Sequence, residues 1–210
     1  MKRYLFLICF AATAVPAAAV EQGRWGAAVQ GIYSAPAGAL TQWFKPAANY
    51  AITAGQQYNR RWFLEGLLEY SSFSRENLTG YPEGRLELSL EHTALLFSGR
   101  YRLAPVSMLH PYLHFGAGVL HWKGVRGEVE ADPAIDLPHI DEKVLQEYNW
   151  SFRLGAGMEF MISSSLSLDL FAHDRLVIGD LYPTMQPHIE LEGVSGFQSL
   201  NAGLGLRYYF

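Results

Sequence analysis

The sequence predicts an all-β fold, an eight-stranded antiparallel transmembrane β-barrel with short turns at one end and longer loops at the other. Half of the 210 residues are hydrophobic, yet no unbroken apolar run after the first twenty residues approaches the roughly 18 that a membrane helix needs. Instead, apolar and polar residues alternate with a period of two in segment after segment. Short and long connections also alternate along the chain, as a membrane barrel requires.

The first four strands are predicted at 24–33, 47–58, 62–71 and 85–103. In the first, Trp25 and Val29 alternate with Gln30, and in the third Leu68 alternates with Glu69. The second segment alternates in the same way but is only weakly apolar. The fourth changes phase near 91–93, which indicates either a β-bulge or the point where the strand leaves the membrane.

The last four strands are predicted at 112–119, 148–162, 166–173 and 200–210. The clearest, YNWSFRLGAGMEFMI, is apolar along one whole face from Tyr148 to Ile162, while Arg153 and Glu159 lie on the other face. A soluble surface has no need of so long an apolar stripe. A strand with lipid on one side and a polar lumen on the other does need it.

The connections between these segments alternate in length. Short ones are predicted at 59–60, 103–109 and 163–165, and long ones at 35–46, 74–84, 123–147 and 179–196. Both termini then lie at the short-turn end. The longest loop, 123–147, is acidic and carries two prolines, and we expect it to reach into the medium.

The amino terminus reads as a signal peptide over residues 1–19, followed by the barrel domain over residues 20–210. Lys2 and Arg3 give a positive start, an apolar stretch follows, and small residues suit cleavage after Ala19. The alternative, an amino-terminal membrane anchor, is disfavoured because the apolar stretch is short. Cleavage would change the net charge from −4 to −6, since two of 16 Lys+Arg are lost against 20 Asp+Glu, and would remove the single cysteine.

The composition excludes several other classes of protein. Hydrophobic residues at 50% and aromatic residues at 14% are too abundant for a disordered, low-complexity or collagen-like chain. A single cysteine excludes a disulfide scaffold. The negative net charge argues against a nucleic-acid partner.

The chain resembles the small outer-membrane β-barrels of Gram-negative bacteria, the folds of outer membrane proteins A (its barrel domain), W and X. The resemblance covers essentially residues 20–210, and rests on the signal peptide, the eight alternating segments, PYLHFGAG at 111–118 and the ending LRYYF. It implies the outer membrane as location, with periplasmic turns and extracellular loops. Leu206, Tyr208 and Phe210 look like the carboxy-terminal signal that the barrel-assembly machinery reads.

The resemblance also implies outer-membrane lipid and lipopolysaccharide as surroundings, a monomer, and no cofactor. Ten aromatic residues near the strand ends are assigned to girdles at the membrane interfaces. They are Trp25, Trp62, Trp122, Trp150, Tyr58, Tyr70, Tyr112, Tyr148, Tyr208 and Phe210.

An eight-stranded barrel leaves an interior only wide enough for side chains. The inward positions carry both signs of charge, and an unpaired buried charge would cost several kcal/mol. We therefore expect a paired network that plugs the lumen. Its predicted members are Arg24, Glu65, Glu69, Arg100, Arg153, Glu159, Asp169, His173 and Arg207.

Two groups of residues suggest other chemistry. His173 with Asp174 could serve a hydrolase acting on lipid A, but a nucleophile must lie within reach of such a base, and the His-x-Ser pattern of lipid A deacylases is absent. His139, Asp141 and Glu142, with His188, could bind a metal, although a solvated acidic loop explains the first three better.

We expect an integral barrel that is not an enzyme and that serves a structural or interaction role in the envelope. A narrow conduit for small apolar molecules, as in the W-type family, and a lipid A-modifying barrel enzyme are the alternatives. The fold alone does not decide among the three, because one fold hosts many functions.

Overall fold

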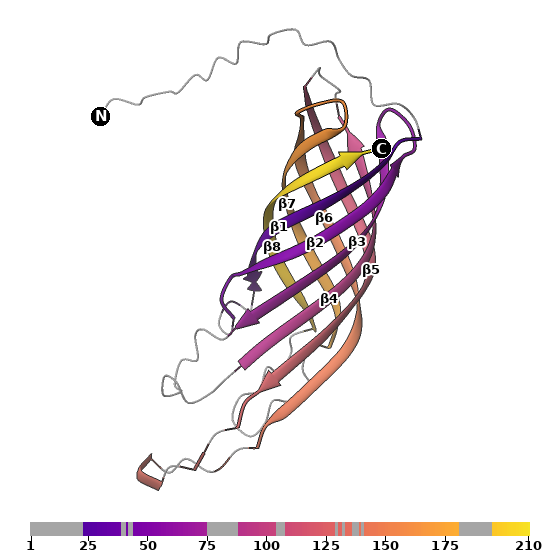
Figure 1. The fold of residues 1–210 in the computed structure, drawn as a ribbon. Helices are drawn as coiled ribbons and strands as arrows, with labels where there is room; N and C mark the ends of the chain where they lie inside the picture. Colours follow the sequence, from indigo (N-terminus) through magenta and orange to yellow (C-terminus); the bar gives the residue numbers. More distant parts are fainter. Residues whose placement is uncertain are drawn as a thin grey trace, which may run out of the picture.

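The computed structural model describes residues 23–38, 41, 44–74, 88–103, 108–128, 130–131, 133–135, 139, 141–180 and 195–210. The predicted signal peptide lies outside the described residues. The described residues form eight strands and one 3-10 turn, η2 (Pro133–Ile135). The strands are β1 (Trp25–Ala37), β2 (Ala47–Gln57), β3 (Trp62–Ser74), β4 (Leu88–Arg102), β5 (Leu109–Arg126), β6 (Lys143–Met161), β7 (Leu166–Asp180) and β8 (Ser195–Tyr209) (Figure 1).

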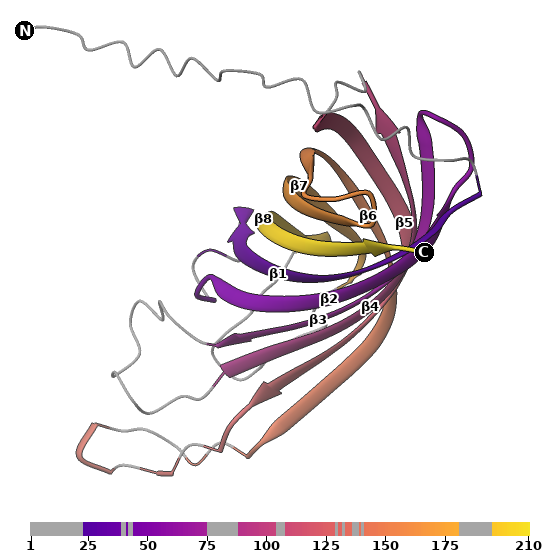
Figure 2. The same cartoon turned by 45° about the horizontal axis from the view of Figure 1, so that its top comes forward.

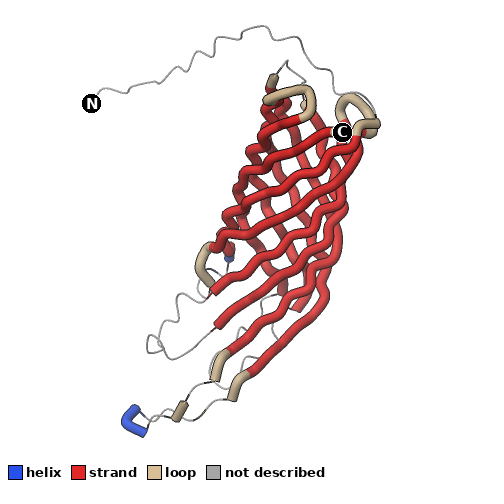
Figure 3. The backbone as a smooth tube through the Cα atoms, in the orientation of Figure 1, coloured by secondary structure: helices blue, strands red, loops and turns tan. Residues whose placement is uncertain are grey.

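The strands form a closed antiparallel barrel, which confirms the predicted fold class. Each strand pairs with the next, and β1 pairs with β8 to close the ring. At the seam, the backbone N–H of Trp25 donates to the carbonyl of Phe210 at 3.1 Å, and the N–H of Phe210 donates back at 2.9 Å. The strands run tilted around the wall (Figures 2 and 3). Closure pairs backbone groups that could not remain unpaired in hydrocarbon.

The two faces of the wall follow the predicted alternation. Val29 and Leu95 are exposed on the outer face, while the residues on either side of each are buried in the lumen. No helix among the described residues is long and apolar enough to cross a membrane.

Strands β5 and β6 are longer than predicted. Their pairing continues to Arg126 opposite Lys143, so the connection between them covers 127–142 and not 123–147. Figure 1 shows β4, β5 and β6 reaching beyond their neighbours at the end opposite the carboxy terminus. The prediction was wrong because the apolar stripe ends where a strand leaves lipid, whereas backbone pairing continues. The predicted loop 74–84 falls almost wholly outside the described residues, as does 179–196, whose ends belong to β7 and β8.

The phase change in the fourth segment is not a β-bulge. Strand β4 pairs in continuous register with β3 and β5, including Glu91 with Ser72 and Lys123. The pattern changes because the lumen becomes apolar at the loop end of the barrel. There an apolar cluster of buried side chains contains Phe44, Phe73, Leu88, Leu90, Leu120, Trp122, Val177 and Phe197.

Two predicted girdle residues belong to the lumen. Trp122 has no exposed surface and donates its indole N–H to Asn149 Oδ1 at 2.6 Å. Tyr112 is also buried. Both lie at positions of β5 whose side chains point into the lumen. Nearness to a strand end therefore does not show which face of the wall a side chain is on. Other members, including Trp25, Trp150 and Tyr208, are exposed on the outer face.

Candidate functional site

The middle of the lumen holds a central charged cluster, defined here as Glu65, Arg100, Arg153, Asp169 and Arg207. Period-two alternation points these side chains inward from β3, β4, β6, β7 and β8. Glu65 Oε1 accepts from Arg100 Nε at 2.9 Å and from Arg153 Nη2 at 3.3 Å, while its Oε2 accepts from Arg207 Nη2 at 2.6 Å. One carboxylate therefore ties three other strands together.

Arg100 extends this cluster to the opposite wall. Its Nη1 donates to Asp169 Oδ2, and its guanidinium lies 4.8 Å from the centre of the Tyr112 ring. The Tyr112 hydroxyl in turn donates to Asp169 Oδ1 at 2.5 Å. Asp169 thus has a charged and a neutral donor, which is how a buried carboxylate is accommodated away from water.

A second group lies nearer the short turns. Arg102 Nη2 donates to Glu159 Oε2 at 2.8 Å and to the Tyr209 hydroxyl at 3.0 Å. The Ser167 hydroxyl donates to Glu159 Oε1 at 2.8 Å, and the Tyr209 hydroxyl donates to the same oxygen. His110 Nδ1 lies 3.8 Å from Glu159 Oε2.

A third ion pair lies nearer the loops. Arg175 Nη2 on β7 donates to Glu69 Oε2 on β3, and the Ser71 hydroxyl donates to Glu69 Oε1 at 3.3 Å. The side chains of Asn49, Ser34 and Asn201 form a separate short chain of hydrogen bonds. Each buried carboxylate among the described lumen residues therefore contacts at least one arginine.

Besides His110, three described histidines are buried in the lumen: His92, His114 and His173. The His114 and His173 rings lie 5.3 Å apart, and His173 stacks on Phe171 at 5.8 Å. His92 packs between Phe73 and Phe197. Both ring nitrogens of His92 and of His173 have no hydrogen-bond partner among the described residues. No described nucleophile or acid is therefore arranged to use the His92 or His173 ring as a base.

His173 and Asp174, considered above for lipid A hydrolysis, do not form a dyad. His173 is buried in the lumen and Asp174 lies on the outer face, since consecutive strand residues point to opposite sides. In the long loop, His139 Nε2 lies 3.1 Å from Asp141 Oδ1 and 3.7 Å from Glu128 Oε1, and all three side chains are exposed. Within the described ranges no group of three or more potential ligands is arranged to hold a metal. His188 lies outside them.

The predicted lumen residues are thus distributed over several groups. Among the residues that the structure describes, Arg24 joins none of these ion pairs and donates instead to the Ser164 carbonyl at 2.8 Å, at the β6–β7 turn. Sequence reasoning missed Arg102, although the predicted fourth segment, 85–103, contains it on the same face as Arg100. It missed Arg175 because the predicted seventh segment ended at His173, one step of the same period short.

The chain matches the family described as outer membrane protein beta-barrel domain over residues 5–210. No curated protein matches it significantly. Among solved structures it is similar to a major outer membrane protein of Thermus thermophilus, with a TM-score of 0.56 and 13% identity over 90% of this chain and 99% of that one.

It is also similar to the attachment invasion locus protein Ail of Yersinia pestis, with a TM-score of 0.54 and 13% identity over 90% of this chain and 100% of that one. Neisserial surface protein A gives a TM-score of 0.54 and 13% identity over 89% and 97% of the two chains. At these identities the likeness concerns the fold alone. This chain belongs to the outer membrane protein beta-barrel domain family and is an outer-membrane protein.

Proposed function

We propose that this protein is an integral outer-membrane barrel whose lumen is plugged by its charged network and which serves a structural or interaction role in the envelope. The observation that carries the proposal is the position of Glu65, whose fully buried carboxylate accepts hydrogen bonds from Arg100, Arg153 and Arg207. Arg100 comes from β4, the neighbour of β3, but Arg153 on β6 and Arg207 on β8 come from non-adjacent strands, so their contacts with Glu65 cross the lumen.

A solute passing through the barrel would have to separate these pairs. Removing one partner from a buried ion pair costs about 3–5 kcal/mol, and the solute would meet several pairs in succession. The apolar cluster around Trp122 and Phe197 adds a second layer at the loop end. Both layers support a closed lumen.

The outer end of the barrel is the proposed contact surface. Strands β4, β5 and β6 extend furthest there (Figure 1), and the connection between β5 and β6 carries exposed acidic side chains such as Glu128, Asp141 and Glu142. At the other end, Leu206, Tyr208 and Phe210 are exposed on the outer face, where the barrel-assembly machinery could read them. Lipid and lipopolysaccharide would surround the wall of a single barrel.

The two alternatives are supported less well. A conduit for small apolar molecules would favour an apolar lumen, whereas the middle of this lumen is lined by arginines and carboxylates. A lipid A-modifying enzyme needs a nucleophile beside an oriented base, and the outer-face Asp174 has no histidine on its own side of the described strands β6–β8.

Liposome swelling tests the proposal. Vesicles containing the folded protein should swell no faster in small sugars or amino acids than empty vesicles, while vesicles with an open porin should swell rapidly. Swelling above the empty-vesicle rate would contradict a plugged lumen. Mass spectrometry of lipid A from cells with and without the protein should give identical species, and a mass difference would favour the enzyme.

A further inference from the structure

Asp174 is an acidic side chain set in the apolar outer wall. Its direct neighbours across the sheet are Leu154 on β6 and Leu200 on β8. Along its own strand, Ala172 precedes it and Leu176 follows it on the same face. An ionisable group among lipid-facing side chains is costly, and such groups in membrane proteins usually mark functional sites.

The hydrogen bonding of Asp174 is incomplete. Its Oδ2 accepts from Gln198 Nε2 at 2.8 Å. Its Oδ1 is buried and has no hydrogen-bond partner in the part of the chain that the structure describes. A buried acceptor without a donor costs about 1–3 kcal/mol, so this oxygen favours a ligand that brings a donor.

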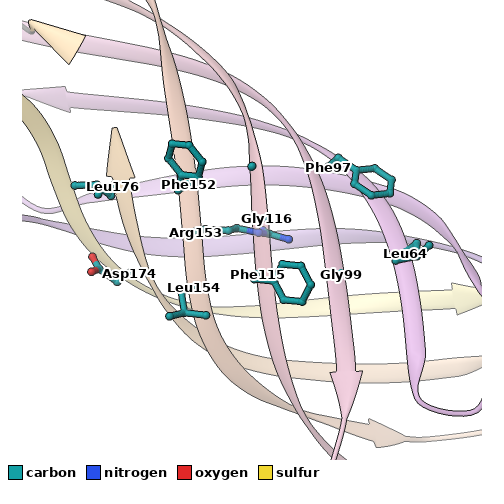
Figure 4. Close-up of a pocket in the computed structure, with 11 residues that line it drawn as sticks. Leu64, Phe97, Gly99, Phe115, Gly116, Phe152, Arg153, Leu154, Asp174 and Leu176 are labelled. Atoms are coloured by element: carbon teal, nitrogen blue, oxygen red, sulfur yellow. The ribbon is translucent and has the colours of Figure 1, made fainter. Parts of the chain in front are cut away.

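Two grooves on the outer wall meet at this carboxyl group. The larger, of about 680 Å³, runs across β3–β7 and is lined mostly by apolar side chains such as Phe97, Phe115 and Phe152, with Arg153 and Asp174 as its charged lining residues (Figure 4). The smaller, of about 460 Å³, is lined by residues of β1, β6, β7 and β8. Asp174 and Leu154 line both. Volumes of this order suit small-molecule ligands, and an apolar wall suits an acyl chain.

The depth of Asp174 fits a lipid head group. It lies eight residues beyond Leu166, the first residue of β7 after the periplasmic turn. At the rise and tilt of a barrel strand this is roughly 20 Å along the membrane normal, near the extracellular edge of an apolar band about 25 Å tall. A lipid of the outer leaflet can place its head group there and its chains in the groove below.

We propose that Asp174, oriented by Gln198, anchors a membrane lipid that carries a primary ammonium group, with an acyl chain lying in the apolar groove between β3 and β7. An ammonium supplies both the N–H donor that Oδ1 lacks and the positive charge that a carboxylate in apolar surroundings requires. A quaternary ammonium lacks the N–H, and an anionic head group has the wrong charge. The site lies on the outer wall and is independent of the state of the lumen.

Native mass spectrometry of the detergent-solubilised protein tests this assignment. The probes are phosphatidylethanolamine, phosphatidylcholine and phosphatidylglycerol with identical acyl chains. The protein should retain phosphatidylethanolamine about tenfold more tightly than either of the others, as a charge-assisted hydrogen bond implies. Equal retention of the three lipids would overturn the proposal, and this comparison needs no variant.

Asp174→Asn provides the second arm, because it keeps the shape of the side chain and removes its charge. The variant should bind phosphatidylethanolamine no better than phosphatidylcholine. Asp141→Asn, the same change on an exposed loop, should keep the wild-type preference. Heat-modifiable gel mobility shows that each variant is folded. A preference that persists in folded Asp174→Asn would overturn the proposal.

Discussion

Glu65 Oε2 lies 2.6 Å from Arg207 Nη2, and neither side chain has exposed surface. Glu65 is on β3 and Arg207 on β8, two strands that are not neighbours in the barrel. The ion pair therefore crosses the lumen. Arg100 with Asp169 and Arg175 with Glu69 also join non-adjacent strands, so the pairs brace the wall from inside.

Glu65→Gln should destabilise the barrel by about 3–5 kcal/mol, because it removes the negative charge that balances three buried arginines. Urea unfolding in phospholipid vesicles, followed by tryptophan fluorescence, measures the change. Glu128→Gln alters an exposed side chain and should shift stability by less than about 0.5 kcal/mol. Equal effects of the two substitutions would show that the central charged cluster does not brace the barrel.

Glu69 and Arg175 should behave as a coupled pair. Glu69→Met and Arg175→Met should each cost about 3–5 kcal/mol, since each leaves a buried charge without its partner. The double variant should recover most of this loss, because two apolar side chains can occupy the same space. A double-mutant cycle in urea measures the coupling. Simple additivity of the two losses would contradict the pairing.

Gly203 and Gly31 should respond differently to alanine. A Cβ on Gly203 would lie 2.5 Å from Phe171 Cζ and 2.6 Å from the Gly31 carbonyl oxygen, whereas a Cβ on Gly31 meets nothing within 4 Å. Gly203→Ala should therefore cost about 1–3 kcal/mol through overpacking, and Gly31→Ala should leave stability nearly unchanged. The midpoints of urea unfolding report both, and a neutral Gly203→Ala would show that the lumen is looser than described.

A charged side chain on the outer wall should be tolerated only where the strands extend above the apolar band of the membrane. Leu204→Arg places a cation near the middle of the apolar band and should cost about 2–4 kcal/mol. Val144→Arg lies on the extension of β6, above the band, and should cost at most about 1 kcal/mol. The free energies of unfolding of the two variants in vesicles, each compared with wild type, check how deep each position lies in the membrane. A larger loss for Val144→Arg would mean that the membrane covers the extended ends of β5 and β6.

The sequence was sufficient for the barrel because lipid and lumen impose opposite polarity on alternate residues. That signal locates Val29, Leu68 and Leu170 on the wall without any knowledge of pairing. It fails where the polarity of the two faces is reversed, as at Leu88 and Leu90, which are apolar and inward while Ser89 between them is polar. Which residues form ion pairs depends on strand register and barrel shear. The pattern of residues along a single strand contains no information on either.

Position along a strand is also a poor predictor of the environment of particular side chains. Trp122 is predicted at an interface but is buried in the lumen, and Arg24 is predicted in the network but binds a turn. The outer-wall position of Asp174 is hard to recognise from the sequence, because the adjacent His173 suggests a catalytic pair. Its significance depends on the surrounding apolar wall, which only the assembled sheet reveals.

Conductance across a planar lipid bilayer tests the central claim, that the charged network closes the lumen. The wild-type protein should show no stable open level in concentrated salt. A variant in which Glu65, Arg153 and Arg207 are replaced by alanine, provided that it folds, should conduct. A steady, reproducible conductance from the folded wild-type barrel would contradict the account.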